Sequence, residues 1–187
     1  MFLVLLPTIS FAEETPEKVL EKILADIKAA SNTSPVVEYV DWDKAFKNMP
    51  EERRKMINVE TPEAMKGYYK EVLKDPVAVM KQQFESRLDS LPPAQRPVYE
   101  QNFARMQKVL EEKTKEMFSR IADTEYKIGT AEIKDNVAIV PLTQSYKEEK
   151  REEKVRFEKS GAKWMLPAVS SMSSQQQQAP AGAPAPQ

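Results

Sequence analysis

The chain has 187 residues, of which 41% are hydrophobic and 30% are charged, and its formal net charge is −1. It contains no cysteine and no histidine, which excludes thiolate nucleophiles, disulfides, histidine-bound zinc or haem, and catalytic triads that use imidazole. A net charge so close to zero gives no global attraction for nucleic acid. We therefore expect no cofactor and no nucleic-acid partner. We also expect no metal site, although a hard cation bound by carboxylates stays open; the sequence has no Asp-x-Asp-x-Asp-Gly loop for one.

The first twelve residues predict a secretory signal peptide. Residues 2–6 are apolar, Ser10-Phe11-Ala12 puts small residues where a signal peptidase cleaves, and charged residues begin at Glu13. The run has no basic start, so the natural beginning could lie further upstream; the alternative is a buried N-terminal strand or helix. Because it is too short to span a bilayer, we expect a periplasmic or secreted protein without an integral membrane segment.

The next part predicts helices. Thr15 is a favourable N-cap, Pro16 suits the first helical position, and the helix is expected to end after Ala30. Its apolar residues recur at spacings of three and four, at Leu20, Ile23, Leu24 and Ile27. Two short helical pieces are expected on either side of Asp41, the second ending near Met49.

Residues 50–123 are expected to form a helical insertion. Helices should start at Pro62 and Pro76, and a long one should run from about residue 94 to 121. The long helix carries large apolar residues at spacings of three, four and seven: Tyr99, Phe103, Met106, Leu110, Met117 and Ile121. We interpret this stripe as core rather than as a ligand site.

After residue 123 the hydrophobic period changes from helical to alternating. Strands are predicted over 126–133, 137–146, 152–159 and 163–166, with turns at 135–136 and 160–161. The fold class is therefore α+β, with the N-terminal and long central helices packed on a C-terminal antiparallel meander sheet. We expect residues 13–169 to form one domain, followed by a disordered Ser/Gln/Ala/Pro tail over 170–187.

Four segments carry a resemblance to a known family: Thr15-Pro16-Glu17, Val37-Glu38-Tyr39-Val40-Asp41-Trp42, and the segments 135–140 and 157–164. In this order they resemble the nuclear transport factor 2-like superfamily, also called the cystatin-like cone. Within that superfamily, the chain resembles small exported bacterial proteins and lipoproteins of unknown function. The resemblance implies a cone-like sheet, and the long helices of residues 50–123 are expected to fill or cap its pocket.

The resemblance also implies candidate site residues. Enzymes of the superfamily place an Asp or His beside a Tyr in the cone, and without histidine only an Asp–Tyr pair remains. The catalytic candidates are Tyr39, Asp41 and Asp43, with Tyr126 or Tyr146 facing them. The alternative is that Asp41 caps the short helix and Trp42 fills the cone. A binding pocket would be lined by Trp42, Tyr126 and Tyr146.

These features favour a non-catalytic binding or interaction module, for a small apolar ligand or a protein partner. Two alternatives stay open. One is a cone-pocket enzyme that transfers a proton with an Asp–Tyr pair. The other is a small periplasmic helical chaperone, since the helices are charged outside and rich in methionine inside.

Overall fold

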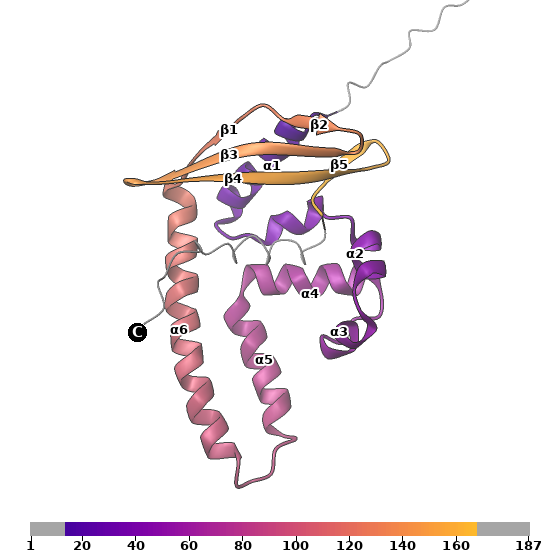
Figure 1. Ribbon diagram of the computed structural model, residues 1–187. Helices are drawn as coiled ribbons and strands as arrows, with labels where there is room; N and C mark the ends of the chain where they lie inside the picture. Colours follow the sequence, from indigo (N-terminus) through magenta and orange to yellow (C-terminus); the bar gives the residue numbers. More distant parts are fainter. Residues whose placement is uncertain (1–13, 168–187) are drawn as a thin grey trace, which may run out of the picture.

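The computed structural model describes residues 14–167, which form an α+β fold with the helices first and an antiparallel sheet last (Figure 1). The predicted fold class is confirmed. The predicted signal peptide and the predicted C-terminal tail lie outside the described residues, and so both stay predictions.

Two N-terminal α-helices begin directly after their N-cap residues, Thr15 and Asp41. Helix α1 (Pro16–Ala30) begins after Thr15, whose side chain accepts a hydrogen bond from the Lys18 N–H. The two short pieces are the 3-10 helix η1 (Ser34–Tyr39) and α2 (Trp42–Asn48). Four side chains of α1 are buried in the main core: Val19, Leu20, Ile23 and Ile27.

Helices fill the middle of the chain, as predicted: α4 (Pro62–Lys74), α5 (Pro76–Leu88) and α6 (Arg96–Asp123). Helix α3 (Glu51–Met56) lies within the predicted helical insertion but was not predicted as a separate helix, because its Glu-Glu-Arg-Arg-Lys sequence has no apolar period and none of its residues is buried. Its acidic first turn and basic last turn do complement the helix dipole, a signal that was present in the sequence.

The sheet has five strands: β1 (Glu125–Ile128), β2 (Glu132–Lys134), β3 (Val137–Tyr146), β4 (Glu149–Ser160) and β5 (Lys163–Met165). Their order is β1-β3-β4-β5, and β2 also pairs with β3. The strand predicted over 126–133 is wrong as a single element, because it breaks into β1 and β2 around Gly129. A Cβ atom at Gly129 would lie 3.0 Å from the Pro141 side chain on β3, so glycine fits this close approach without displacing Pro141.

The inner face of the sheet is apolar at one end and polar at the other. At the apolar end, Ala138, Val140 and Phe157 are completely buried and share a core with α1. Further along β3 and β4, the same face carries the cross-strand pairs Gln144–Arg151 and Tyr146–Glu149. The polar end of the sheet meets the C-terminal part of α6.

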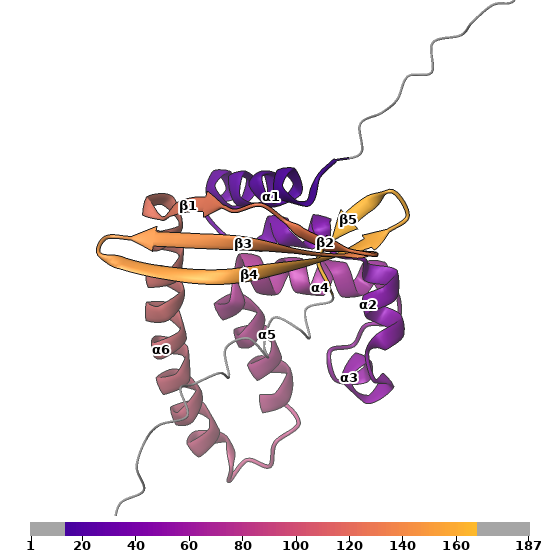
Figure 2. The ribbon, with the colours of Figure 1, turned by 45° about the horizontal axis from the view of Figure 1, so that its top comes forward.

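Helices α5 and α6 form an arm (residues 76–123) that projects away from the sheet (Figures 1 and 2). The arm has its own aromatic cluster, in which the ring of Phe84 stacks on Phe103 and Tyr99, with centroid distances of 3.7 and 4.9 Å. The main core includes Ile121 at the base of α6 but not Phe103. The arm is therefore held by a cluster of its own as well as by its base.

The interpretation of the α6 stripe as core is wrong at two of its six residues, Met106 and Met117. Phe103 and Ile121 are buried, but Met106 and Met117 are 54% and 45% exposed. Helix α5 packs on the side of α6 that carries Phe103. The remaining apolar side of α6 is exposed in the described structure.

Candidate binding site

Asp41, the predicted base, acts as a helix cap. Its carboxylate accepts one hydrogen bond from the Lys44 backbone N–H at 3.0 Å and another from the Ser160 hydroxyl at 2.7 Å. The Lys44 N–H, and after it the Ser160 hydroxyl, lower the pKa of Asp41 below its usual value. A general base at neutral pH works best with a raised pKa, so this environment suits capping better than proton abstraction.

The other two catalytic candidates do not converge on Asp41. The Tyr39 hydroxyl donates a hydrogen bond to the Asp26 carboxylate at 2.6 Å. Burial, together with this carboxylate, raises the pKa of Tyr39 far above its usual range. Asp43 is exposed in the first turn of α2. The contacts match the alternative in which Asp41 caps the short helix.

The three predicted pocket residues fall into two places. Trp42 is buried, its indole N–H donates to the Val37 carbonyl at 2.6 Å, and its ring stacks on Tyr69 at 5.6 Å. It lines a shallow cavity together with Asp41 and Asp43. Tyr126 and Tyr146 line a different cavity, at the polar end of the sheet. The structure thus brings the two tyrosines together and leaves Trp42 apart from them.

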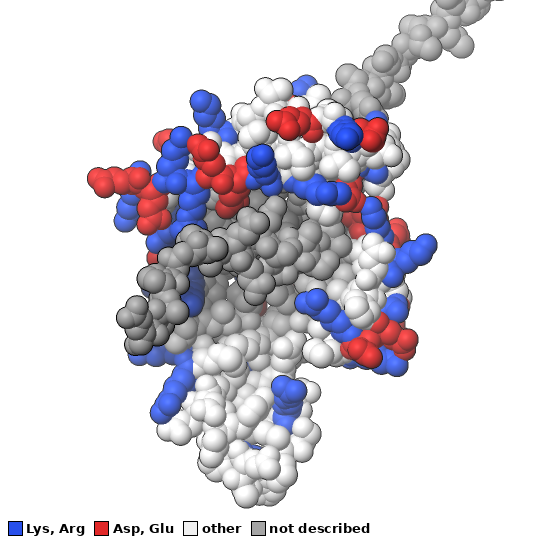
Figure 3. Space-filling model, viewed as in Figure 1, with Lys and Arg blue, Asp and Glu red and all other residues white. Residues whose placement is uncertain are grey.

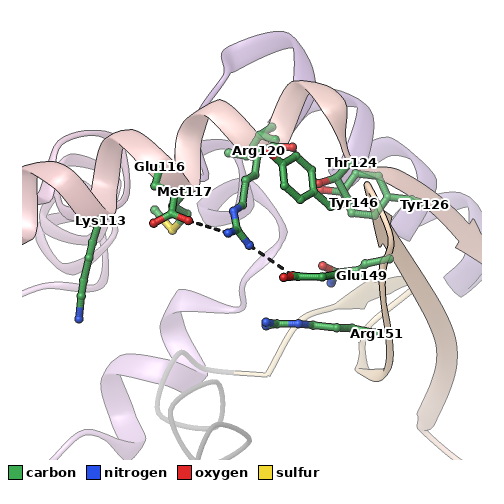
Figure 4. A pocket seen from close by; sticks show the side chains of 11 residues that line it. Lys113, Glu116, Met117, Arg120, Thr124, Tyr126, Tyr146, Glu149 and Arg151 are labelled. Carbon is green, nitrogen blue, oxygen red and sulfur yellow. Dashed lines mark hydrogen bonds and ion pairs between the residues drawn. The ribbon is translucent and has the colours of Figure 1, made fainter.

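The cavity at the two tyrosines, here called the hairpin pocket, lies between the end of α6 and the β3–β4 hairpin (Figure 4) and has a volume of about 400 Å³. Drug-sized ligands occupy pockets of roughly this size. Its walls combine apolar, aromatic and charged side chains. They are Lys113, Glu116, Met117, Arg120, Ile121, Thr124, Tyr126, Gln144, Tyr146, Glu149 and Arg151.

Arg120 ties α6 to the hairpin. Its guanidinium pairs with Glu116 at 2.6 Å and Glu149 at 3.5 Å, and it lies 4.9 Å from the centre of the Tyr146 ring (Figure 4). The two carboxylates that line the hairpin pocket, those of Glu116 and Glu149, are therefore both paired with Arg120. Burial raises the pKa of Tyr126, so this phenol is neutral at physiological pH.

The exposed apolar side of α6 leads into this pocket. Residues three or four apart share one side of a helix, and on this side Val98, Met106, Val109 and Met117 are 62%, 54%, 52% and 45% exposed. We call this surface the α6 face: Val98, Arg105, Met106, Val109, Lys113 and Met117. At 1.5 Å per residue it is about 29 Å long. Lys113 and Met117 belong to both the α6 face and the hairpin pocket.

Within residues 14–167, no cluster of three or more acidic side chains is arranged to hold a metal ion. No helix in the same range has the length and apolar character needed to cross a membrane. The arrangement described here can bind a partner or ligand by apolar contact and charge.

Comparison with known proteins adds little. No protein-family model matches the chain, and no curated protein matches it. A crystal structure of a "putative NTF2-like transpeptidase" from Campylobacter jejuni is similar over 82% of this chain and 98% of its own, with 10% sequence identity and a TM-score of 0.37. This likeness is too weak to assign a family or an activity to the chain.

The sequence interpretation missed the α6 face, although part of its signal was present. Arg105, Lys113 and Arg120 recur on the side of α6 that also carries Val98 and Val109. A core helix rarely carries cations within its buried stripe. This mixture of cations and exposed apolar side chains is more typical of an interface.

Proposed function

We propose that this chain is an exported, non-catalytic interaction module that binds segments of other polypeptides along the α6 face and into the hairpin pocket. The observation that carries the proposal is the concentration of exposed apolar side chains on one helix. Four of the six exposed large hydrophobic side chains in the described residues lie on α6. Contiguous apolar surface of this kind usually marks an interaction site.

The shape of the surface favours a polypeptide over a small ligand. The exposed surface of the α6 face is about 29 Å long and matches the length of a helix of nearly twenty residues, whereas a small molecule would cover only the hairpin pocket. Met106 and Met117 add a flexible surface that adapts to different side chains. Binding of the apolar side of an amphipathic helix to an apolar surface is a recurring mode of recognition, and it agrees with the chaperone alternative drawn from the sequence.

Export is the second part of the proposal. It is supported by residues 1–12, where an apolar run and small residues precede the charged Glu13. Protein recovered from the cell envelope or the medium should have an N-terminus at Glu13 when sequenced. Recovery of the chain from the cytosol with residues 2–11 still attached would contradict export.

The binding proposal can be tested with a permanently unfolded protein. Reduced, carboxymethylated α-lactalbumin should bind the chain in a fluorescence anisotropy titration, and native α-lactalbumin should not. In the test variant, Met106→Gln and Met117→Gln are combined. Both side chains are about half exposed, so the fold should tolerate the change. Each loses about 1 kcal/mol of new apolar burial on binding, so we expect at least a tenfold loss of affinity.

A control variant places two substitutions by Gln on the far side of α6. Lys108→Gln with Lys115→Gln alters two exposed residues outside the α6 face and should leave binding unchanged. Equal affinities of the wild type and the methionine variant would refute the assigned surface. Absence of binding by the wild type would refute the function.

A further inference from the structure

The side of α6 that carries the α6 face has a small excess of positive charge. Its cations are Arg105, Lys113 and Arg120 and its carboxylates are Glu116 and Asp123, which gives 3 − 2 = +1. The rest of the helix surface has three cations and three carboxylates, which gives 3 − 3 = 0. These are Arg96, Lys108, Lys115, Glu100, Glu111 and Glu112. Asp123 lies six residues beyond Met117, so the cations next to the exposed apolar side chains are Arg105 and Lys113.

Pairing within the structure involves only one of the three cations on this side, Arg120. Glu116 and Glu149 are both bound by Arg120, at 2.6 and 3.5 Å. Arg105, Lys113 and Arg151 form no ion pair with any residue in the described part of the chain. In the space-filling view, the lower part of the arm is mostly uncharged and shows Lys and Arg but no Asp or Glu (Figure 3). The cations beside the α6 face therefore remain available to an external anion.

We propose that the segment bound by the α6 face is acidic and amphipathic and belongs to another protein. Its apolar side would cover Met106, Val109 and Met117. Its carboxylates would meet Arg105 and Lys113 on the α6 face and Arg151 in the hairpin pocket. Complementary charge of this kind selects partners and speeds association. The inference rests on the proposed function and adds the chemistry of the partner.

Two occupants from the chain itself fit less well. Residues 168–187 contain no Asp or Glu, so they cannot satisfy the cations. A second copy docking through the same α6 face would set Arg105 and Lys113 against their own counterparts, and like charges placed opposite one another are destabilising. An acidic segment of a different protein satisfies both the apolar and the charged parts of the surface.

The test uses three helical peptides of roughly 18 residues, about 27 Å of helix. All share one leucine face, and the polar face carries Glu, Gln or Lys at the same positions. Anisotropy titrations with the wild-type chain should rank the peptides Glu, then Gln, then Lys. We expect the Glu peptide to bind roughly five- to tenfold more tightly than the Gln peptide, with the advantage lost at about 1 M salt.

Two double variants then test which cations of the chain bind the carboxylates of the Glu peptide. Arg105→Gln and Lys113→Gln together should reduce binding of the Glu peptide to that of the Gln peptide, without changing the latter. Lys108→Gln with Lys115→Gln serves as the control and should change neither. If the Glu and Gln peptides bind equally, the proposed function stands and the charge inference is overturned. If no peptide binds, both are overturned.

A basic apolar helix face can also attach to an anionic membrane, and the same variants distinguish this case. Vesicles of palmitoyl-oleoyl-phosphatidylglycerol should not bind the wild-type chain appreciably. Vesicle binding that depends on Arg105 and Lys113, combined with equal affinity for the Glu and Gln peptides, would overturn the inference in favour of a lipid surface.

Discussion

The aromatic cluster of the arm should control the local stability of α5 and α6 separately from that of the sheet. Phe103 is buried and stacks on Phe84, but it lies outside the main core. Replacing a buried Phe by Ala typically costs about 3–5 kcal/mol. Because Phe84 and Tyr99 are themselves only partly buried, we expect the cost of Phe103→Ala to be near the lower end, about 3 kcal/mol.

Loss of about 3 kcal/mol from a local unit should appear as local opening rather than global unfolding. Amide hydrogen exchange in the arm, over residues 80–113, should become roughly a hundredfold faster, since 1.4 kcal/mol corresponds to a factor of ten. Exchange in β3 and β4 should stay the same. The midpoint of urea unfolding followed by tryptophan fluorescence should also stay the same, because Trp42 and Trp164 both lie in the main core.

Phe157→Ala provides the comparison, because Phe157 has no exposed surface and lies at the centre of the main core. This variant should lower the global unfolding free energy by about 3–5 kcal/mol and accelerate exchange throughout the sheet. The reasoning would be refuted if Phe103→Ala accelerated exchange in β3 and β4 as much as in the arm. It would equally be refuted if exchange in the arm did not change.

Three further predictions concern the main body of the protein. Trp164→Ala should cost about 3–5 kcal/mol in urea unfolding, because the indole is buried against the core, and a loss under about 1 kcal/mol would contradict that packing. Asp41→Ala removes the α2 cap and should cost about 0.5–2 kcal/mol while leaving polypeptide binding intact; loss of binding with the fold preserved would move the site toward α2. The Ala131 N–H donates a hydrogen bond to the Glu17 carboxylate and lowers the pKa of Glu17 in the folded protein. This hydrogen bond therefore adds to the free energy of unfolding at pH values above the unfolded-state pKa, and its contribution is lost as the pH falls through the lower folded-state pKa. Unfolding free energy should therefore decline below about pH 4, and less so in Glu17→Gln; an equal decline would show that other carboxylates account for it.

Local signals in the sequence predicted most element boundaries. Thr15-Pro16 marked the start of α1, and Asp135-Asn136 marked the turn before β3, where Asp135 adopts a left-handed conformation with φ of 54°. Such signals act through the backbone of a few neighbouring residues, so they can be read without knowledge of the fold. The role of Gly129 could not be predicted from local sequence, because the side chain that limits the space there belongs to Pro141, twelve residues further along the chain on β3.

The candidate site could be predicted only in part. Tyr126 and Tyr146 were expected to share a pocket, and they do, because Tyr126 pairs with Gln144 on the same face of the sheet as Tyr146. The position of Trp42 relative to them depended on how the sheet packs on the helices, which the spacing of residues does not reveal. Likewise, the period of α6 showed which side chains share a side of the helix, but not which of them another element would cover.

The exposed apolar side of α6 lies between two points at which the helix is anchored to the rest of the structure. At its tip α6 is held by the Phe84–Phe103 stack, and at its base by Ile121 in the core and by Arg120, which pairs with Glu149 on the hairpin. Between these anchors Met106 and Val109 contribute little to folding, since about half of each remains in contact with solvent. Their apolar surface is therefore still available to a partner, at about 25 cal/mol per Å² covered. A helix fixed at both ends also loses little conformational freedom when it binds, so most of that energy would appear as affinity.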